Sequence, residues 1–171
     1  MKKFQLKVLV ATALAIATSS ASADYLLSGG SNSDGKSSMS VGFNGHGNWG
    51  MEVGVIFDAE FTGNLIDYPV PHTLYTDLGT KKTMNTLGLD IARFFEVSSQ
   101  VRAFGELGMY VETKKHIAQS TATGWYYTQE DQSSIVGAAG VGIQYTSSGG
   151  LIVGAGFHSL RGANVSIGMS Y

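Results

Sequence analysis

The stretch GMEVGVIFDAEF, residues 50–61, alternates apolar and non-apolar side chains, with Ile56 as the one exception. Its odd-numbered positions are all apolar, whereas its even-numbered positions include Glu52, Asp58 and Glu60. A helix would scatter these carboxylates around an apolar cylinder, but a strand places them on one face because successive side chains point to opposite sides. The stretch therefore predicts a β-strand with one apolar face and one mixed face.

The same alternation recurs in six further segments, and residues 24–31 form a weaker first strand whose parity the sequence does not fix, which makes eight predicted strands. The connections that follow the second, fourth and sixth strands are tight, whereas those after the third and fifth, residues 62–82 and 114–132, are long and polar. Short turns at one end and longer loops at the other are typical of a transmembrane β-barrel with both termini on the periplasmic side. Each segment is near the roughly 9–11 residues that a tilted strand needs to cross a bilayer. The other seven segments are residues 24–31, 37–45, 83–95, 100–113, 134–145, 150–159 and 164–171.

The chain begins with the features of an export signal. Three lysines precede an apolar run, and the run is followed by small residues that end in Ala21-Ser22-Ala23. This order is that of a cleaved secretory signal peptide, and the run is too short for a membrane-spanning helix. We therefore expect a signal peptide at residues 1–23 and one folded domain at residues 24–171.

Composition narrows the possible functions. After cleavage the domain carries eight basic and 13 acidic residues, a formal charge of −5, so nucleic acid is not an expected partner. The chain has no cysteine, its histidines lack ligand-like spacing, and its glycine clusters lack the G-x-G-x-x-G pattern. We therefore expect no metal site and no cofactor.

A secreted β-sandwich is the competing interpretation, because its strands also alternate. However, the non-apolar faces here are small and mixed rather than rich in lysine and threonine, as the filled interior of a narrow barrel would be. Aromatic residues also gather near strand ends, where they could form interfacial girdles. Both features favour an all-β fold, an eight-stranded antiparallel up-and-down transmembrane β-barrel.

These features resemble those of small eight-stranded outer-membrane barrels, the OmpA-like transmembrane domain and the opacity and OmpX-like surface proteins. The resemblance rests on the signal peptide, the eight alternating segments, the long second and third loops and the terminal V-x-I-x-M-x-Y. It implies an outer-membrane location, contact with lipid and lipopolysaccharide, and a monomeric barrel. It also implies that the barrel-assembly machinery reads the last strand, through Val165, Ile167, Met169 and Tyr171.

The alternation places several charged side chains inside the barrel. Arg102 is the one basic residue of this set, and Asp90 is its expected partner because a tight turn makes their strands neighbours. We expect a structural network rather than a gated ion path, since eight strands leave an interior filled by side chains. The expected network is Glu52, Asp58, Asp90, Arg102 and Glu106.

A lipid A-modifying enzyme is an alternative function, and we expect no catalytic residues. The adjacent His158 and Ser159 would point to opposite faces of a strand, so they could not act as a pair.

The loop segment GWYYTQED raises the possibility of surface contact through Trp125, Tyr126 and Tyr127. Alternatively, these aromatics pack on a facing loop of an extended hairpin. The predicted function is a non-enzymatic envelope barrel whose loops could mediate adhesion to an unidentified surface ligand.

Overall fold

The computed structural model describes residues 24–45, 48–67 and 74–170, and in them every regular element is a β-strand. The described part of the chain contains no helix with the length and apolarity to cross a membrane. Eight of the strands build the wall of a barrel, as the alternation predicts. They are β1 (Asp24–Ser31), β2 (Ser37–Asn44), β3 (Trp49–Ile56), β6 (Thr86–Glu96), β7 (Val101–Ser120), β8 (Tyr126–Thr146), β9 (Leu151–His158) and β10 (Gly162–Met169).

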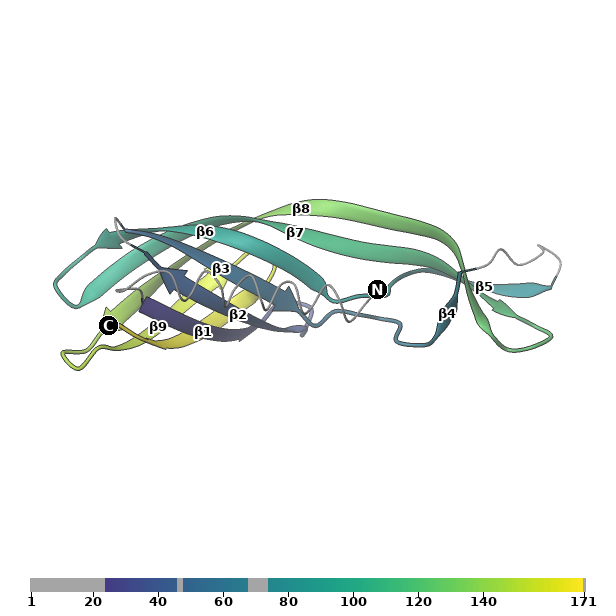
Figure 1. Ribbon diagram of the computed structural model, residues 1–171, viewed down its shortest axis with the longest axis horizontal. Helices are drawn as coiled ribbons and strands as arrows, with labels where there is room; N and C mark the ends of the chain where they lie inside the picture. The colour runs from purple at the N-terminus through teal and green to yellow at the C-terminus, as the bar shows by residue number, and fades with distance from the viewer. Residues whose placement is uncertain (1–23, 46–47, 68–73, 171) are drawn as a thin grey trace.

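These eight strands close into an antiparallel barrel (Figure 1). Each pairs with its neighbour in the chain, β3 pairs with β6, and β10 pairs with β1 to close the ring. The fold predicted from the sequence is therefore confirmed. Closure leaves no free sheet edge in the wall, so its backbone groups are paired all the way round.

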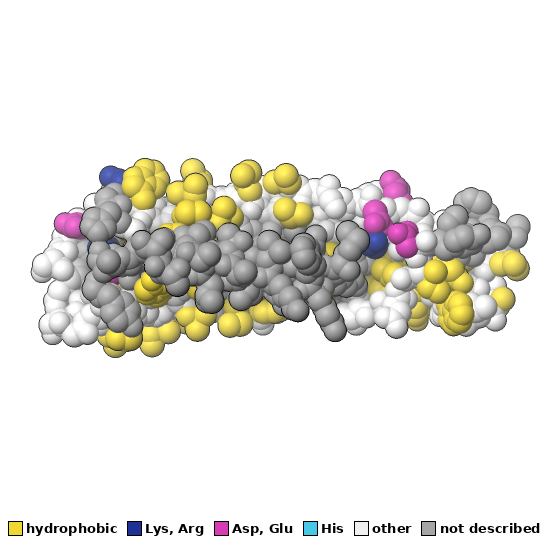
Figure 2. Space-filling model, in the orientation of Figure 1, with side chains coloured by type: hydrophobic (Ala, Val, Ile, Leu, Met, Phe, Trp, Pro, Cys, Tyr) yellow, Lys and Arg dark blue, Asp and Glu magenta, His cyan; other side chains and the backbone are white. Residues whose placement is uncertain are grey.

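The register aligns apolar side chains around the outside of the wall. Leu27 lies opposite Ile167 on one side and Val41 on the other, and Val53 continues the row to Leu89. Figure 2 shows apolar side chains along both visible edges of the barrel. The pairing of β1 with β2 and β10 also shows which side chains of β1 face outward, which the sequence alone does not decide.

The outward side chains are strongly exposed, whereas the inward ones are mixed: polar groups, small residues and a few large apolar side chains such as Leu26 and Phe94. Leu107 and Ile135 are each 71% exposed and Val165 is 67% exposed, although all three are apolar. The inward positions hold buried polar groups, including Ser28, Ser40, Asp90, Glu106, Gln144 and His158. This inverts the arrangement of a water-soluble sandwich, which buries its apolar face.

The wall continues on one side into a sheet that projects beyond the barrel (Figure 1). Strands β7 and β8 stay paired from Val101 and Tyr145 as far as Gln119 and Tyr126. Strand β5 (Tyr75–Lys82) pairs with the outer half of β7, and the short β4 (Leu65–Ile66) pairs in parallel with β8. We call this four-stranded part the extension.

The extension corrects the prediction of two long polar loops, and its β7–β8 part agrees with the alternative of an extended hairpin. Residues 75–82 and most of 114–132 are strands, and only a short turn joins β7 to β8. The sequence pattern failed here because both faces of this sheet carry polar side chains, which removes the period-two signal. Strand β3 is also shorter than residues 50–61 and ends at Ile56.

Candidate functional site

The centre of the barrel is occupied by Arg161, which the sequence pattern did not single out. Arg161 lies in the turn between β9 and β10, and its side chain is 2% exposed. Its guanidinium donates to Ser40 on β2, Glu52 on β3, Asp90 on β6 and Glu106 on β7. We call these five residues, with Tyr110 and His158, the Arg161 cluster. One side chain thus connects four strands across the interior.

The turn itself is folded toward the interior, which explains how a turn residue reaches the centre. His158 Nδ1 accepts hydrogen bonds from the backbone N–H groups of Leu160 and Arg161, at 3.2 and 3.0 Å. Because Nδ1 is the acceptor, the ring proton lies on Nε2, which is 3.1 Å from Asp90 Oδ1. Ser38 Oγ donates to the carbonyl of Arg161 at 3.1 Å. These bonds fix the direction of the guanidinium.

Inward glycines leave the space that the Arg161 cluster occupies. Tyr110, fully buried, donates to Asp90 Oδ2 at 2.6 Å, and its ring lies against Gly88. A Cβ at Gly88 would overlap that ring, and a Cβ at Gly54 would lie 2.7 Å from the Tyr110 hydroxyl. These glycines therefore fit the ring into the wall.

A second charged group, the Lys82 cluster, closes the end of the barrel next to the extension. Lys82 Nζ lies 2.6 Å from Asp58 Oδ2 and 2.7 Å from Glu112 Oε1. Asp58 also accepts from the backbone N–H and the hydroxyl of Thr86, at 2.9 and 2.8 Å. The cluster lies beyond Phe57, which directly follows β3, and Val111 on β7, the last exposed large apolar side chains there before the extension.

Ionisation in the Lys82 cluster is mutually supported. Burial alone would raise the pKa of Asp58, but hydrogen bonds from Lys82 and Thr86 hold that pKa below its ordinary value. Burial also opposes the charge of Lys82, yet hydrogen bonds to Asp58 and Glu112 raise its pKa. The hydrogen bond from Lys82 is the main cause of the lowered pKa of Glu112. The cluster is therefore an ion triad at neutral pH.

Arg102 forms a third group at the opposite end, and its predicted partner is wrong. Its guanidinium lies 2.7 Å from Asp24 Oδ2 and 5.3 Å from the centre of the Phe94 ring. Strands β6 and β7 are neighbours, as expected. In their backbone register, however, Arg102 lies opposite Glu96, whereas Asp90 lies opposite Gly108. The six-residue offset along β7 separates Arg102 from Asp90. The predicted network is thus distributed over three separate groups.

A small cavity lies within the barrel, beside the Arg161 cluster. It is lined by Glu52, Glu106 and Arg161, and also by neutral polar side chains such as Asn44 and Gln144. It leaves about 20 Å³ for the centres of water molecules, which corresponds to about one water. The side-chain oxygen of Gln144 and Nε of Arg161 are buried and have no hydrogen-bond partner among the described residues.

His158 and Ser159 do point in opposite directions. The His158 side chain is buried inside the barrel, whereas Ser159 is exposed and its hydroxyl accepts from the N–H of Ala139 at 3.1 Å. His46 and His72 lie outside the described residues, and His116 pairs with Asp77 in the extension at 2.9 Å. Among the residues that the structure describes, no group of three or more His, Cys, Asp or Glu is arranged for a metal ion.

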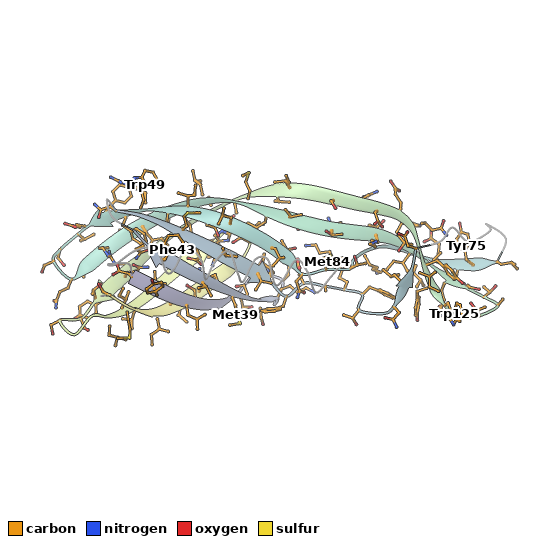
Figure 3. The ribbon with its side chains drawn as sticks, in the orientation of Figure 1. Met39, Phe43, Trp49, Tyr75, Met84 and Trp125 are labelled. Carbon is orange, nitrogen blue, oxygen red and sulfur yellow. The ribbon has the colours of Figure 1, made fainter. Side chains whose placement is uncertain are left out.

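The three aromatic residues predicted for surface contact have different environments. Trp125 is 59% exposed at the tip of the extension, far from Trp49 at the opposite end (Figure 3). Tyr126 packs edge-on against Phe61, with ring centres 5.0 Å apart, and Tyr127 is half-buried. Tyr126 therefore packs on a facing segment, as the alternative interpretation expects, whereas the Trp125 side chain is exposed to the surroundings.

The last strand has the predicted alternation. Val165, Ile167 and Met169 are exposed on the outer face of β10, and this strand pairs with both β1 and β9. Tyr171 and the expected signal peptide, residues 1–23, lie outside the described residues.

Comparison with known proteins gives structural likenesses only. No protein-family model matches the chain, and no curated protein matches it. Three solved structures are similar at low identity. One is Ail, the attachment invasion locus protein of Yersinia pestis, in complex with the heparin analogue sucrose octasulfate, with 15% identity, a TM-score of 0.44, and coverage of 88% of this chain and 94% of that chain. Another is the N-terminal β-barrel domain of Pseudomonas aeruginosa OprF, with 12% identity, a TM-score of 0.48, and coverage of 88% and 97% of the two chains. The third is Neisserial surface protein A, with 16% identity, a TM-score of 0.40, and coverage of 87% and 90%.

Proposed function

We propose that the protein is a non-enzymatic β-barrel of a Gram-negative outer membrane, exported through a cleaved signal peptide. The observation that carries this proposal is the inversion of the wall, whose outer face is apolar and exposed while its interior buries charged and polar side chains together with a few apolar ones. An exposed apolar band of this extent favours contact with lipid, and closure supplies the backbone pairing that a bilayer requires. Lipopolysaccharide and phospholipid are the proposed surroundings of a monomeric barrel.

The interior supports a structural rather than a conducting role. The Arg161 cluster crosses the barrel at its centre, and the Lys82 and Arg102 groups occupy its two ends. Buried charges bound in this way hold strands together and leave little room for ions to pass. We therefore assign these groups to the stability of the envelope barrel.

The extension supports a second part of the proposal, contact with a surface ligand outside the cell. Its pairing with the barrel wall is continuous, so the exposed Trp125 is carried on a rigid support well beyond the apolar band. Large exposed aromatic side chains are frequent anchors of protein contacts. The proposed contact residue is Trp125, because Tyr126 is already packed against Phe61.

Membrane insertion is tested by cell fractionation and by heat modifiability. The mature protein should be found in outer membranes, require detergent for extraction, and change its gel mobility when it is boiled in SDS. A protein that is soluble in the periplasmic fraction would refute the proposal. Lipid A mass spectra with and without the protein test the non-enzymatic role, which a change in acyl number would refute.

Surface contact is tested with Trp125→Ala and the matched control Leu74→Ala. Both side chains are exposed at the outer part of the protein, at 59% and 53%. Binding of cells or immobilised glycans should fall with the tryptophan substitution and persist with the control, at equal surface expression. Equal binding by both variants and the unsubstituted protein would refute a contact role for Trp125.

A further inference from the structure

The Arg161 cluster contains more negative than positive charge. It has three carboxylates, those of Glu52, Asp90 and Glu106, and one guanidinium, so its formal charge is −2. His158 does not add a positive charge, because its Nδ1 accepts two backbone hydrogen bonds. Uncompensated charge is costly at a buried position. The cluster therefore favours one more positive group.

The cavity beside the cluster offers a place for that group. It is bordered by Glu52 and Glu106, two of the three carboxylates, by Arg161, by neutral oxygen-bearing side chains, and on part of its wall by apolar side chains such as Phe94 and Phe104. Arg161 contacts Oε1 of both carboxylates, which leaves Oε2 of each for another ligand. Gln144 also lines the cavity; it is 3% exposed, and its side-chain oxygen is buried without a partner among the described residues.

We propose that this cavity binds one hard cation, held by Glu52, Glu106 and the side-chain oxygen of Gln144. The donors are all oxygens, a set that suits Na⁺ or Ca²⁺ better than transition metals. The space fits one ion about the size of a water molecule. A water could satisfy Gln144 but would leave the excess negative charge, whereas a cation satisfies both. The proposal needs only the closed barrel and does not depend on surface contact.

Thermal unfolding in a cation-exchanged buffer tests the proposal. The refolded barrel is chelated and transferred in detergent to choline chloride at pH 8, because choline is too large for the cavity. Sodium, potassium, magnesium or calcium chloride then replaces choline at constant ionic strength, and the unfolding temperature is followed by circular dichroism. One cation should raise this temperature in a saturable manner, as a ligand of the folded state does. If sodium and potassium raise the unfolding temperature equally, and magnesium and calcium also raise it equally, the effect is charge screening and the proposal is overturned.

Two substitutions in the cavity and one outside it identify the ligands. Gln144→Met removes the unpartnered oxygen at similar volume, and it should weaken the apparent affinity for the selected cation at least tenfold. The control Glu112→Gln removes a carboxylate of the Lys82 cluster and should leave the affinity unchanged. If Gln144→Met shows the same cation response as the unsubstituted protein, the site is wrong.

A direct binding measurement covers the case in which Gln144→Met does not fold. Equilibrium dialysis with radioactive sodium or calcium should give one bound ion per barrel, and Glu106→Gln should lose it while remaining folded. A refolded barrel that binds no ion would show that protons and water compensate the cluster, which would overturn the proposal.

Discussion

Replacement of Arg161 by methionine tests the central role of the Arg161 cluster. The substitution keeps much of the side-chain volume but removes the only guanidinium among Glu52, Asp90 and Glu106, which changes the formal charge of the cluster from −2 to −3. Removal of one partner from a buried ion pair costs about 3–5 kcal/mol. Since folded domains are stable by about 5–15 kcal/mol, Arg161→Met should lose a large part of the free energy of unfolding.

The measurement is reversible urea unfolding in phospholipid vesicles, with tryptophan fluorescence as the probe. Arg102→Met is the matched control, because its ion pair with Asp24 is more accessible, with 22% and 14% of the two side chains exposed. That pair should contribute about 1 kcal/mol. Arg161→Lys should fall between the two, because an ammonium retains the charge but lacks the planar fork. A loss for Arg161→Met no greater than for Arg102→Met would refute the central role.

Three further predictions concern other parts of the protein. Gly88→Ala should cost about 1–3 kcal/mol because its Cβ overlaps a buried ring, whereas Gly105→Ala, which meets nothing within 4 Å, should be neutral in the same urea assay. The lowered pKa of Asp58 means that its stabilising contribution is complete above its ordinary pKa and is lost as pH falls through the folded value. The protection factors of amide hydrogens at the barrel end, corrected for the intrinsic exchange rate, should therefore fall in acid, and Asp58→Asn should remove that pH dependence. The raised pKa of Lys82 means that its stabilising contribution is complete below its ordinary pKa and is lost as pH rises through the folded value. Deletion of Tyr171 should reduce assembly in cells more than the stability of folded barrels, and equal effects on both would contradict a role in recognition by the assembly machinery.

The wall of the barrel could be predicted because lipid and a filled interior impose opposite demands on alternate residues. Segments such as residues 134–145 carry this contrast most clearly from Val141 to Tyr145, so both the strand and its parity follow from the pattern. Strand neighbours could also be predicted, because tight turns join them. The register could not, which is why Arg102 was assigned to Asp90 instead of Asp24.

The Arg161 cluster was beyond the reach of the pattern for a different reason. Alternation assigns a face only to residues in strands, and Arg161 lies in a turn. Its inward direction depends on hydrogen bonds to His158 and Ser38, contacts that form only after β2 and β9 are in place. A usable signal did exist, since the predicted network of four inward carboxylates with one inward arginine left a deficit of positive charge.

The strands of the extension were predicted as polar connections because the extension lies beyond the wall, where neither lipid nor a filled interior selects alternate residues. Beyond Val111 and Ile135 both faces of the sheet are polar or mixed, so the strands there have no apolar side for sequence to reveal. Lys115 and Asp131, for example, are exposed partners 2.7 Å apart on β7 and β8. Their cross-strand pairing is a property of the register and not of the local sequence.

The long pairing of β7 and β8, whose register shifts only at a bulge between His116 and Ile117, also has a mechanical consequence. A pull on the tip of the extension would load both strands along their lengths, because the short turn joins them there. The force would reach the wall as shear along the ladders with β6 and β9, where many hydrogen bonds resist together instead of opening one after another. A tether of this geometry withstands flow better than a flexible loop of the same length.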